Sequence, residues 1–298
     1  MRIGLQLVEF NPAGGPATVA VHLRDVAVAA EQTGLDGLWL LDHFFQMPAV
    51  SGGAGDPMLE CYTTLGYLAA VTERIQLGPL VAGVAYRHPG VLVKTATTLD
   101  VLTGGRAWLG VGAGWYEREA VGLGIPFPSL AQRFRLLEDT VRLARHMCVE
   151  PQPGPFSGAV VAAPEPLNSP QPVREGGLRL LIGGEGETKT LRLVARYADA
   201  SNFDAGGSLA QWREEAHDRF RRKLRVLDEH CADAGRDPAE VLRTANISVD
   251  LASGGVGALP QIVDDLLELG IGQLNVNFRS GCDTAAVEAL GTLAGKMR

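Results

Sequence analysis

Ile3-Gly-Leu-Gln-Leu-Val8 and Leu35-Asp-Gly-Leu-Trp-Leu-Leu41 flank a helical stretch, Thr18–Thr33, and this order of strand, helix and strand decides the fold. Gly34 supplies the expected end of the helix, because glycine readily adopts the left-handed conformation of a C-terminal cap. The apolar residues of the helical stretch recur at helical spacing and share one face, namely Val19, Leu23, Val26, Ala27 and Ala30. The start of the chain therefore predicts a β-α-β unit with parallel strands.

The same alternation continues to the end of the chain. Short runs rich in Leu, Ile and Val recur, and a stretch with helical spacing follows each one. We expect eight strands, at Ile3–Val8, Leu35–Leu41, Ile75–Val81, Arg106–Gly112, Leu178–Ile182, Ala200–Asp204, Arg243–Leu251 and Gly272–Phe278.

Eight such units close into a (β/α)₈ barrel, because right-handed crossovers keep every helix outside the sheet and the last strand can pair with the first. We therefore expect residues 1–298 to form a single TIM-barrel domain. A doubly wound open sheet is the alternative, but no G-x-G-x-x-G turn follows the first strand.

One connection is longer than the others. Between the fourth and fifth strands, Val149–Gly177 contains seven prolines, which disfavour regular structure. We expect this insertion, 149–177, to be an extended loop over a barrel rim that shapes the substrate pocket.

Composition excludes several function classes. Among the 298 residues 46% are apolar and 20% charged, which predicts a globular chain, and the net charge of −7 disfavours nucleic-acid binding. No apolar run reaches the roughly 18 residues of a membrane span, and the N-terminus lacks secretory-signal features, so we expect a cytoplasmic protein. The four cysteines are scattered, without metal-ligand spacing, so we expect no metal.

Five motifs in order resemble the luciferase-like enzymes, especially the branch that uses the deazaflavin coenzyme F420. They are Leu40-Leu-Asp-His-Phe-Phe45, Thr72-Glu-Arg-Ile-Gln-Leu-Gly78, Tyr86-Arg-His-Pro89, Leu109-Gly-Val-Gly-Ala-Gly-Trp-Tyr116 and Leu181-Ile-Gly-Gly-Glu-Gly186. The likeness extends from Met1 to about Pro238. It implies a flavin-type cofactor at the C-terminal ends of the strands, and a homodimer.

Asp42 and His43 close the second strand, at the face where barrel enzymes carry their chemistry. Histidine changes charge near neutral pH and can move a proton. The resemblance implies that His43 lies beside the cofactor ring and assists hydride transfer, and we expect Asp42 to orient it. A structural histidine at a strand end is the alternative.

The third strand ends in small residues instead of a usual turn signal. The resemblance implies a non-prolyl cis peptide at Leu80–Val81, so that Leu80, Val81 and Ala82 form the floor under the cofactor. Such bonds are rare and persist only where packing enforces them. Pro79 as a simple strand terminator is the alternative.

Two glycine-rich loops follow later strands. Gly112, Ala113 and Gly114 allow a planar ring to approach the backbone, and Trp115 can wall that site; a tight turn with core aromatics is the alternative. Some deazaflavin enzymes, including those that oxidise glucose 6-phosphate, carry a catalytic acid where Trp115 stands, which speaks against sugar-phosphate chemistry.

The second loop offers backbone N–H groups to a phosphate at the start of a helix, although barrels more often bind phosphate after the seventh and eighth strands. It consists of Gly183, Gly184, Glu185 and Gly186. We expect Glu185 and Glu187 to point outward, with Lys189 or Arg192 offsetting their charge. A plain glycine-rich loop is the alternative.

Arg87 precedes a helix at the same rim, where it can bind a cofactor or substrate anion, or serve a structural role only. The residues and the resemblance together predict an F420-dependent oxidoreductase that transfers a hydride between the coenzyme and a small-molecule substrate. A monooxygenase that uses reduced FMN and oxygen is one alternative. A non-catalytic flavin-binding protein is another.

Overall fold

All eight predicted strands are present in the computed structural model, which describes residues 1–48, 50, 52–206, 212, 216–251, 255–279 and 281–296. The third predicted strand consists of two short pieces, β3 and β4. The strands are β1 (Arg2–Leu7), β2 (Gly37–Leu40), β3 (Gln76–Pro79), β4 (Ala82–Gly83), β5 (Trp108–Gly112), β8 (Arg179–Gly183), β9 (Ala200–Asp204), β10 (Leu242–Val249) and β11 (Gln273–Phe278).

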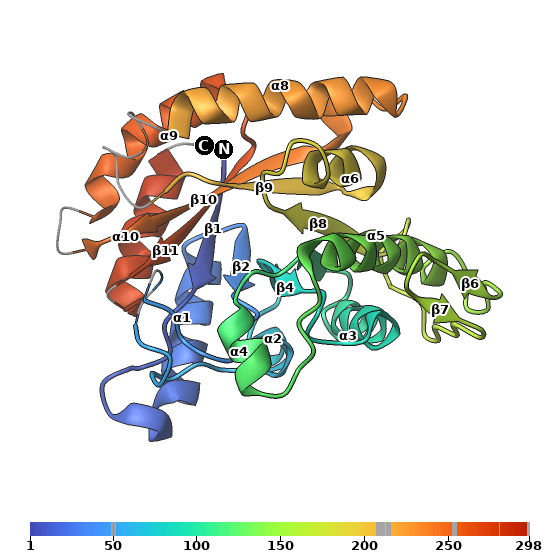
Figure 1. Cartoon of the computed structure of the whole chain (residues 1–298). Coiled ribbons are helices and arrows are strands. Elements are labelled where there is room, and N and C mark those ends of the chain that lie inside the picture. The colour runs from blue at the N-terminus through green and yellow to red at the C-terminus, as the bar shows by residue number, and fades with distance from the viewer. Residues whose placement is uncertain are drawn as a thin grey trace.

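These strands form one parallel sheet that curls into a nearly closed barrel (Figure 1). The last strand, β11, pairs with β1 in register from Arg2 and Gln273 onward. On the other side β4 pairs with β5, and a single bridge between Leu77 and Ala107 links β3 to the start of β5. The predicted (β/α)₈ barrel is therefore confirmed, and the open doubly wound sheet is excluded.

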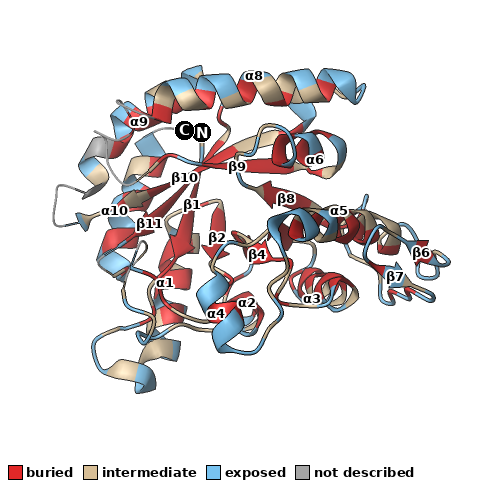
Figure 2. Cartoon of the chain, viewed as in Figure 1, coloured by how far each residue is buried: buried red, intermediate tan, exposed pale blue. Residues whose placement is uncertain are grey.

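Helices surround this sheet, and their apolar faces are buried against it (Figure 2). In α1 the buried face includes Leu23, Val26, Ala27 and Ala30, as the spacing predicts, and Gly34 follows the helix with φ +81°. Within the described residues the α-helices are α1 (Val19–Gln32), α2 (Cys61–Ala70), α3 (Pro89–Leu102), α4 (Glu117–Gly122), α5 (Leu130–Met147), α6 (Thr190–Tyr197), α8 (His217–Asp233), α9 (Leu259–Glu268) and α10 (Thr284–Lys296).

Two tryptophans fill part of the barrel interior. Trp39 and Trp108 are both buried and meet edge to face, with ring centroids 6.0 Å apart. Gly37 makes room for the first indole, since a Cβ at this position would lie 2.6 Å from Trp39 Nε1. The interior is therefore packed with side chains, as expected for a small barrel.

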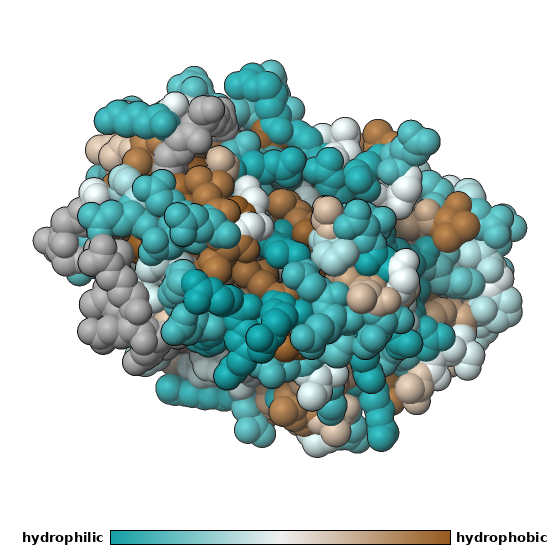
Figure 3. Space-filling model, turned by 90° about the horizontal axis from the view of Figure 1, so that it is seen from above, coloured by the Kyte–Doolittle hydropathy of each residue, from teal (hydrophilic) through white to brown (hydrophobic). Residues whose placement is uncertain are grey.

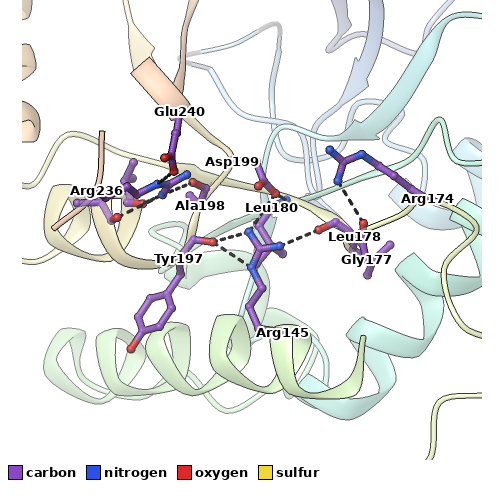
Figure 4. A network of polar contacts seen from close by, with 12 residues as sticks. Arg145, Arg174, Gly177, Leu178, Leu180, Tyr197, Ala198, Asp199, Arg236 and Glu240 are labelled. Atoms are coloured by element: carbon purple, nitrogen blue, oxygen red, sulfur yellow. Dashed lines mark hydrogen bonds and ion pairs between the residues drawn. The ribbon is translucent and has the colours of Figure 1, made fainter. Parts of the chain in front are cut away.

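Polar contacts secure the end of the barrel at which the strands begin. Arg145, from α5, donates to the carbonyl oxygens of Tyr197 and Leu178 and pairs with Asp199 at 3.0 Å (Figure 4). Arg236 donates to the Ala198 carbonyl at 2.8 Å and so satisfies backbone groups at the end of α6. These arginines fix α5 and α6 against the starts of β8 and β9.

The proline-rich segment 149–177 lies at this same end of the molecule. It carries a small hairpin of β6 (Phe156–Ser157) and β7 (Ala162–Ala163), seen beyond the end of α5 in Figure 1. Asn168 donates to Met147 O at 3.0 Å, and Val173 N donates to Asp100 at 2.8 Å. The expectation that this segment shapes the substrate pocket is wrong, because α5 returns the chain to the end opposite the strands' carboxyl termini before the segment starts.

The basic cluster of α8 forms a solvated helix face. Arg221, Arg222 and Arg225 are exposed and pair with the carboxylates of Asp218, Glu187 and Glu229. The face of the molecule seen in Figure 3 is predominantly hydrophilic around smaller apolar areas. Among the described residues, no helix has the length and apolar character required to cross a bilayer.

Candidate active site

A cavity of about 660 Å³ opens where the strands end, at the carboxyl side of the sheet. This volume lies in the range of cofactor and drug-sized ligand sites. Every predicted site residue except Arg87 lines it: Asp42, His43, Leu80, Val81, Ala82, Gly112, Ala113, Gly114, Trp115, Gly183, Gly184, Glu185 and Gly186. The structure thus brings together four chain segments that the sequence predicts to be one site.

His43 is anchored in this cavity by a carboxylate. Its Nδ1 lies 2.5 Å from Oε1 of Glu119, and its side chain is only 10% exposed. The rings of Trp115 and Tyr116 lie 5.7 and 6.0 Å from the imidazole, edge to face. None of the hydrogen bonds between described residues involves Nε2 of His43, so this nitrogen is left for a ligand in the cavity.

The buried carboxylate of Glu119 accepts hydrogen bonds from four donors. Besides His43, it accepts hydrogen bonds from the Tyr86 hydroxyl and from the backbone N–H groups of Phe44 and Phe45, at 2.7 and 3.1 Å for the latter two. Burial by itself would raise the pKa of Glu119, but the bonds from His43 and Tyr86 and the N–H of Phe44 outweigh it, so the pKa lies below its usual value. Glu119 is therefore ionised at neutral pH and accepts the proton of His43 Nδ1.

Asp42 does not orient His43, and this prediction is wrong. Its carboxylate binds the Arg87 guanidinium in a two-point contact of 2.6 and 2.9 Å, and Arg87 also contacts Glu60. Burial raises the pKa of Asp42 and the Arg87 contact lowers it in part. Asp42 and His43 lie in the loop after β2, and their side chains contact different partners: Arg87 for Asp42 and Glu119 for His43.

Arg87 is not brought to the cavity, so its predicted contact with a cofactor anion is wrong. The guanidinium is 15% exposed, is held by two carboxylates and lies 5.0 Å above the Tyr62 ring. These contacts raise the pKa of Arg87 further, despite its burial. Its charge is neutralised inside the protein, which leaves the structural role that the sequence also allowed.

The floor of the cavity is the interrupted third strand. The Leu80–Val81 peptide bond is cis, as the resemblance implied. Glycines of two neighbouring loops pack directly on Val81: a Cβ at Gly112 would lie 2.9 Å from Val81 Cγ2, and a Cβ at Gly183 would lie 3.0 Å from the same side chain. The absence of a side chain at these glycines therefore lets both loops pack closely on the floor.

The Gly183–Gly186 loop leads into α6. Gly184 has φ +115°, and a Cβ at Gly186 would lie 2.9 Å from the Thr190 hydroxyl oxygen. The N-terminus of α6, an eight-residue helix, follows after a turn of three residues, Glu187–Lys189. Backbone N–H groups at such a position attract anions.

The negative charges beside this loop are offset from α8, not from Lys189 or Arg192 as predicted. Glu185 pairs with Arg219 at 3.4 Å and accepts the N–H of Asp204. Glu187 pairs with Arg222 and Lys223. Lys189 instead lies over the Phe134 ring. Local sequence does not predict these pairs, because their partners are far apart along the chain.

Sequence reasoning missed Glu119, the carboxylate that holds His43. The charged run Glu117-Arg118-Glu119 follows the fourth strand, and its place at the catalytic end was the one available signal. Because α4 is a six-residue helix, periodicity does not decide which carboxylate faces inward. Tyr86 and three polar residues of later strands, Asn202, Asp204 and Asn246, also line the cavity and were not predicted. Within the described part of the chain, no group of His, Cys, Asp and Glu side chains could hold a metal ion.

Comparison with known families decides the class. Residues 1–254 match the family model described as luciferase-like monooxygenase. The chain belongs to this family. The match covers the barrel from β1 through β10 and thus every residue that lines the cavity.

Known relatives of this luciferase-like protein include a curated protein named F420-dependent glucose-6-phosphate dehydrogenase from Kineococcus radiotolerans. The two are 30% identical over 238 residues, which is 80% of this chain and 66% of the relative. A protein of the same name from Microbacterium testaceum is 29% identical over 76% of this chain and 64% of its own length. The chain thus spans slightly less than two thirds of these relatives.

Among solved structures, an F420-dependent secondary alcohol dehydrogenase in complex with an F420-acetone adduct superposes with a TM-score of 0.80. It is 17% identical and is covered over 99% of its chain and 100% of this one. A monooxygenase from Streptomyces bottropensis gives a TM-score of 0.78 at 15% identity, with 99% of this chain and 98% of that chain covered. At these identities the likeness establishes the fold of this luciferase-like protein.

Proposed function

We propose that this protein is an F420-dependent oxidoreductase that transfers a hydride between the deazaflavin and a small organic substrate. One observation carries the proposal: His43, held by the ionised Glu119, lines the same cavity as the Leu80–Ala82 floor and the two glycine-rich loops. The names of the 30% identical relatives support the choice of coenzyme.

The residues present fit a planar ring with an anionic tail. Gly112 and Gly183 bring the backbone of two loops close to Val81, where a Cβ would clash. We assign the floor of Leu80, Val81 and Ala82 to the ring. The loop of Gly183, Gly184 and Gly186, with Thr190 at the start of α6, is assigned to a phosphate.

When bound, F420 supplies the carbon that accepts or releases the hydride. The protein moves the accompanying proton. Because Glu119 accepts from Nδ1, the neutral imidazole of His43 carries its lone pair on Nε2, where it takes the proton of a substrate hydroxyl during oxidation and returns it during reduction. The rings of Trp115 and Tyr116 flank the imidazole and limit its orientations.

Direct titration tests the proposal. The purified protein is titrated with F420 and, separately, with FMN, and binding is followed by cofactor fluorescence. We expect a Kd for F420 at or below about 10 µM and much weaker binding of FMN. Tight binding of FMN without binding of F420 would overturn the choice of coenzyme and favour the flavin monooxygenase.

A non-catalytic flavin-binding protein is the remaining rival. It predicts cofactor binding without turnover on any substrate, and no dependence of any activity on His43. A homodimer and a cytoplasmic location stay predictions; light scattering of the purified protein measures the former, and a fluorescent fusion in the host cell measures the latter.

A further inference from the structure

A second cavity of about 470 Å³ adjoins the first at the mouth of the barrel. The two share Leu41, Leu80, Trp115, Asp204 and Asn246 as walls. The second cavity lies over the ends of β1, β10 and β11, where Gln6, Ser248 and Asn277 give it a polar floor. A ligand there is next to the floor assigned to the cofactor ring.

Hydrogen bonds between amide side chains determine which polar atoms of this floor are available to a ligand. The Leu80 carbonyl can only accept, so Gln6 must turn its Nε2 toward it, at 2.9 Å. Its Oε1 then accepts from Nδ2 of Asn277, at 3.0 Å. This order leaves Oδ1 of Asn277 without a partner, although the residue is only 4% exposed. A buried acceptor without a donor calls for a donor from a ligand.

The rim of the cavity offers a positive charge. Arg279 directly follows β11, is exposed and lines the cavity. None of the ion pairs and side-chain hydrogen bonds between described residues involves its guanidinium. Asp204 also lines the cavity, and its Oδ1 already accepts from Gly206 N and Asn246 Nδ2, at 3.0 and 3.3 Å. With respect to the described residues, the guanidinium is therefore available to bind an anion.

We propose that this second cavity is the substrate subsite and that it recognises an anion that carries hydroxyl groups, with Arg279 on the anionic group and Asn277 Oδ1 on a hydroxyl. The Asp204 carboxylate accepts a hydrogen bond from a further hydroxyl group. Placing the substrate here rests on the proposed function, because the adjoining cavity must hold the coenzyme. Carboxylate and phosphate share the required chemistry, and the experiment separates them.

Isothermal titration of the apoprotein and of the F420-saturated protein provides the test. The probes are glycerate, glycerol 3-phosphate, neutral glycerol, and propionate, which lacks hydroxyl groups. We expect glycerate or glycerol 3-phosphate to bind with a Kd below about 10 mM, and glycerol and propionate to bind more weakly by about tenfold or more.

Arg279→Gln should weaken binding of the preferred anion by about tenfold or more, and Arg279→Lys should restore part of it. Arg118→Gln removes an exposed arginine of α4 and is the control for net charge. The proposal is overturned if neither anion binds, if the neutral probe binds equally well, or if both arginine-to-glutamine variants behave alike. Failure to bind F420 with an intact Arg279-dependent anion site would instead overturn the proposed function alone.

Discussion

His43 Nδ1 and Glu119 Oε1 lie 2.5 Å apart, although 76 residues separate them in the chain. The helix that follows the fourth strand thus sets the orientation of an imidazole at the end of the second. Glu119 has no exposed surface, and its other acceptor positions hold the loop that carries His43. The imidazole and its loop are therefore positioned by one carboxylate.

Replacing Glu119 by glutamine should loosen the tautomer of His43. An amide presents both a donor and an acceptor to Nδ1, whereas the carboxylate only accepts. Long-range ¹H–¹⁵N correlation spectra should show one tautomer in the wild type and a mixture in Glu119→Gln. Turnover should fall by about 10- to 100-fold. Glu117→Gln, an exposed neighbour on α4, is the control; an unchanged tautomer and full turnover in Glu119→Gln would disprove the positioning role.

Replacing His43 by alanine should remove turnover and spare cofactor binding. The imidazole transfers a proton in the proposed mechanism, an effect worth about 10²- to 10⁴-fold in rate. The substitution removes none of the other residues that line the cavity, including Leu80–Ala82 and Gly183–Gly186. Stopped-flow absorbance of F420 measures the rate, and fluorescence titration measures the affinity. If the affinity falls as much as the rate, His43 is a binding residue only.

Gly184→Ala should destabilise the protein and weaken F420 binding. At φ +115° an alanine is strained, by about 1–3 kcal/mol in free energy of unfolding. Gly66→Ala is the matched control, because Gly66 lies inside α2 with no heavy atom within 4 Å of an added Cβ, and it should stabilise by up to about 1 kcal/mol. Urea denaturation measures both. Equal effects of the two substitutions would contradict the strain argument.

Glu31→Gln should change how stability depends on pH. Burial raises the pKa of Glu31, but hydrogen bonds from the backbone N–H groups of Arg74, Ile75 and Glu73 outweigh it, so the folded pKa lies below 4.5. The stability that the carboxylate contributes is therefore complete above about pH 4.5 and is lost as the pH falls through the folded pKa.

The variant should lose about 1–3 kcal/mol of unfolding free energy at pH 7, and less in acid. Urea denaturation from pH 7 to about pH 3 measures this difference. Glu73→Gln is the control, because Glu73 is exposed and lies in the segment 73–75 whose N–H groups bind Glu31. A difference between Glu31→Gln and wild type that does not shrink in acid would show that the charge of Glu31 does not matter.

Local pattern was enough to predict the barrel and the place of the site. Alternating strands and helices fix the topology, and the topology carries the ends of all strands to one rim, so His43, Gly112 and Gly183 had to be neighbours. Partners across the chain were beyond local reasoning. Glu119 for His43 and Arg87 for Asp42 depend on side-chain direction at loop ends, where no periodicity applies.

The wrong prediction for segment 149–177 shows a second limit of local sequence patterns. Its proline content correctly indicated irregular structure, but composition does not say at which end of a barrel a loop lies. The element before it decides this: a segment that follows a helix and precedes a strand starts from the helix C-terminus. Its contacts with Met147 and Asp100 follow from that order.

The placement of 149–177 divides the molecule into two regions that can change independently. No residue of the β6–β7 hairpin lines either cavity, so insertions, deletions or a grafted peptide there leave the imidazole and the glycine loops unaltered. Related proteins can therefore gain new binding surfaces at this hairpin without changes in the cavity, and an affinity tag can be inserted there.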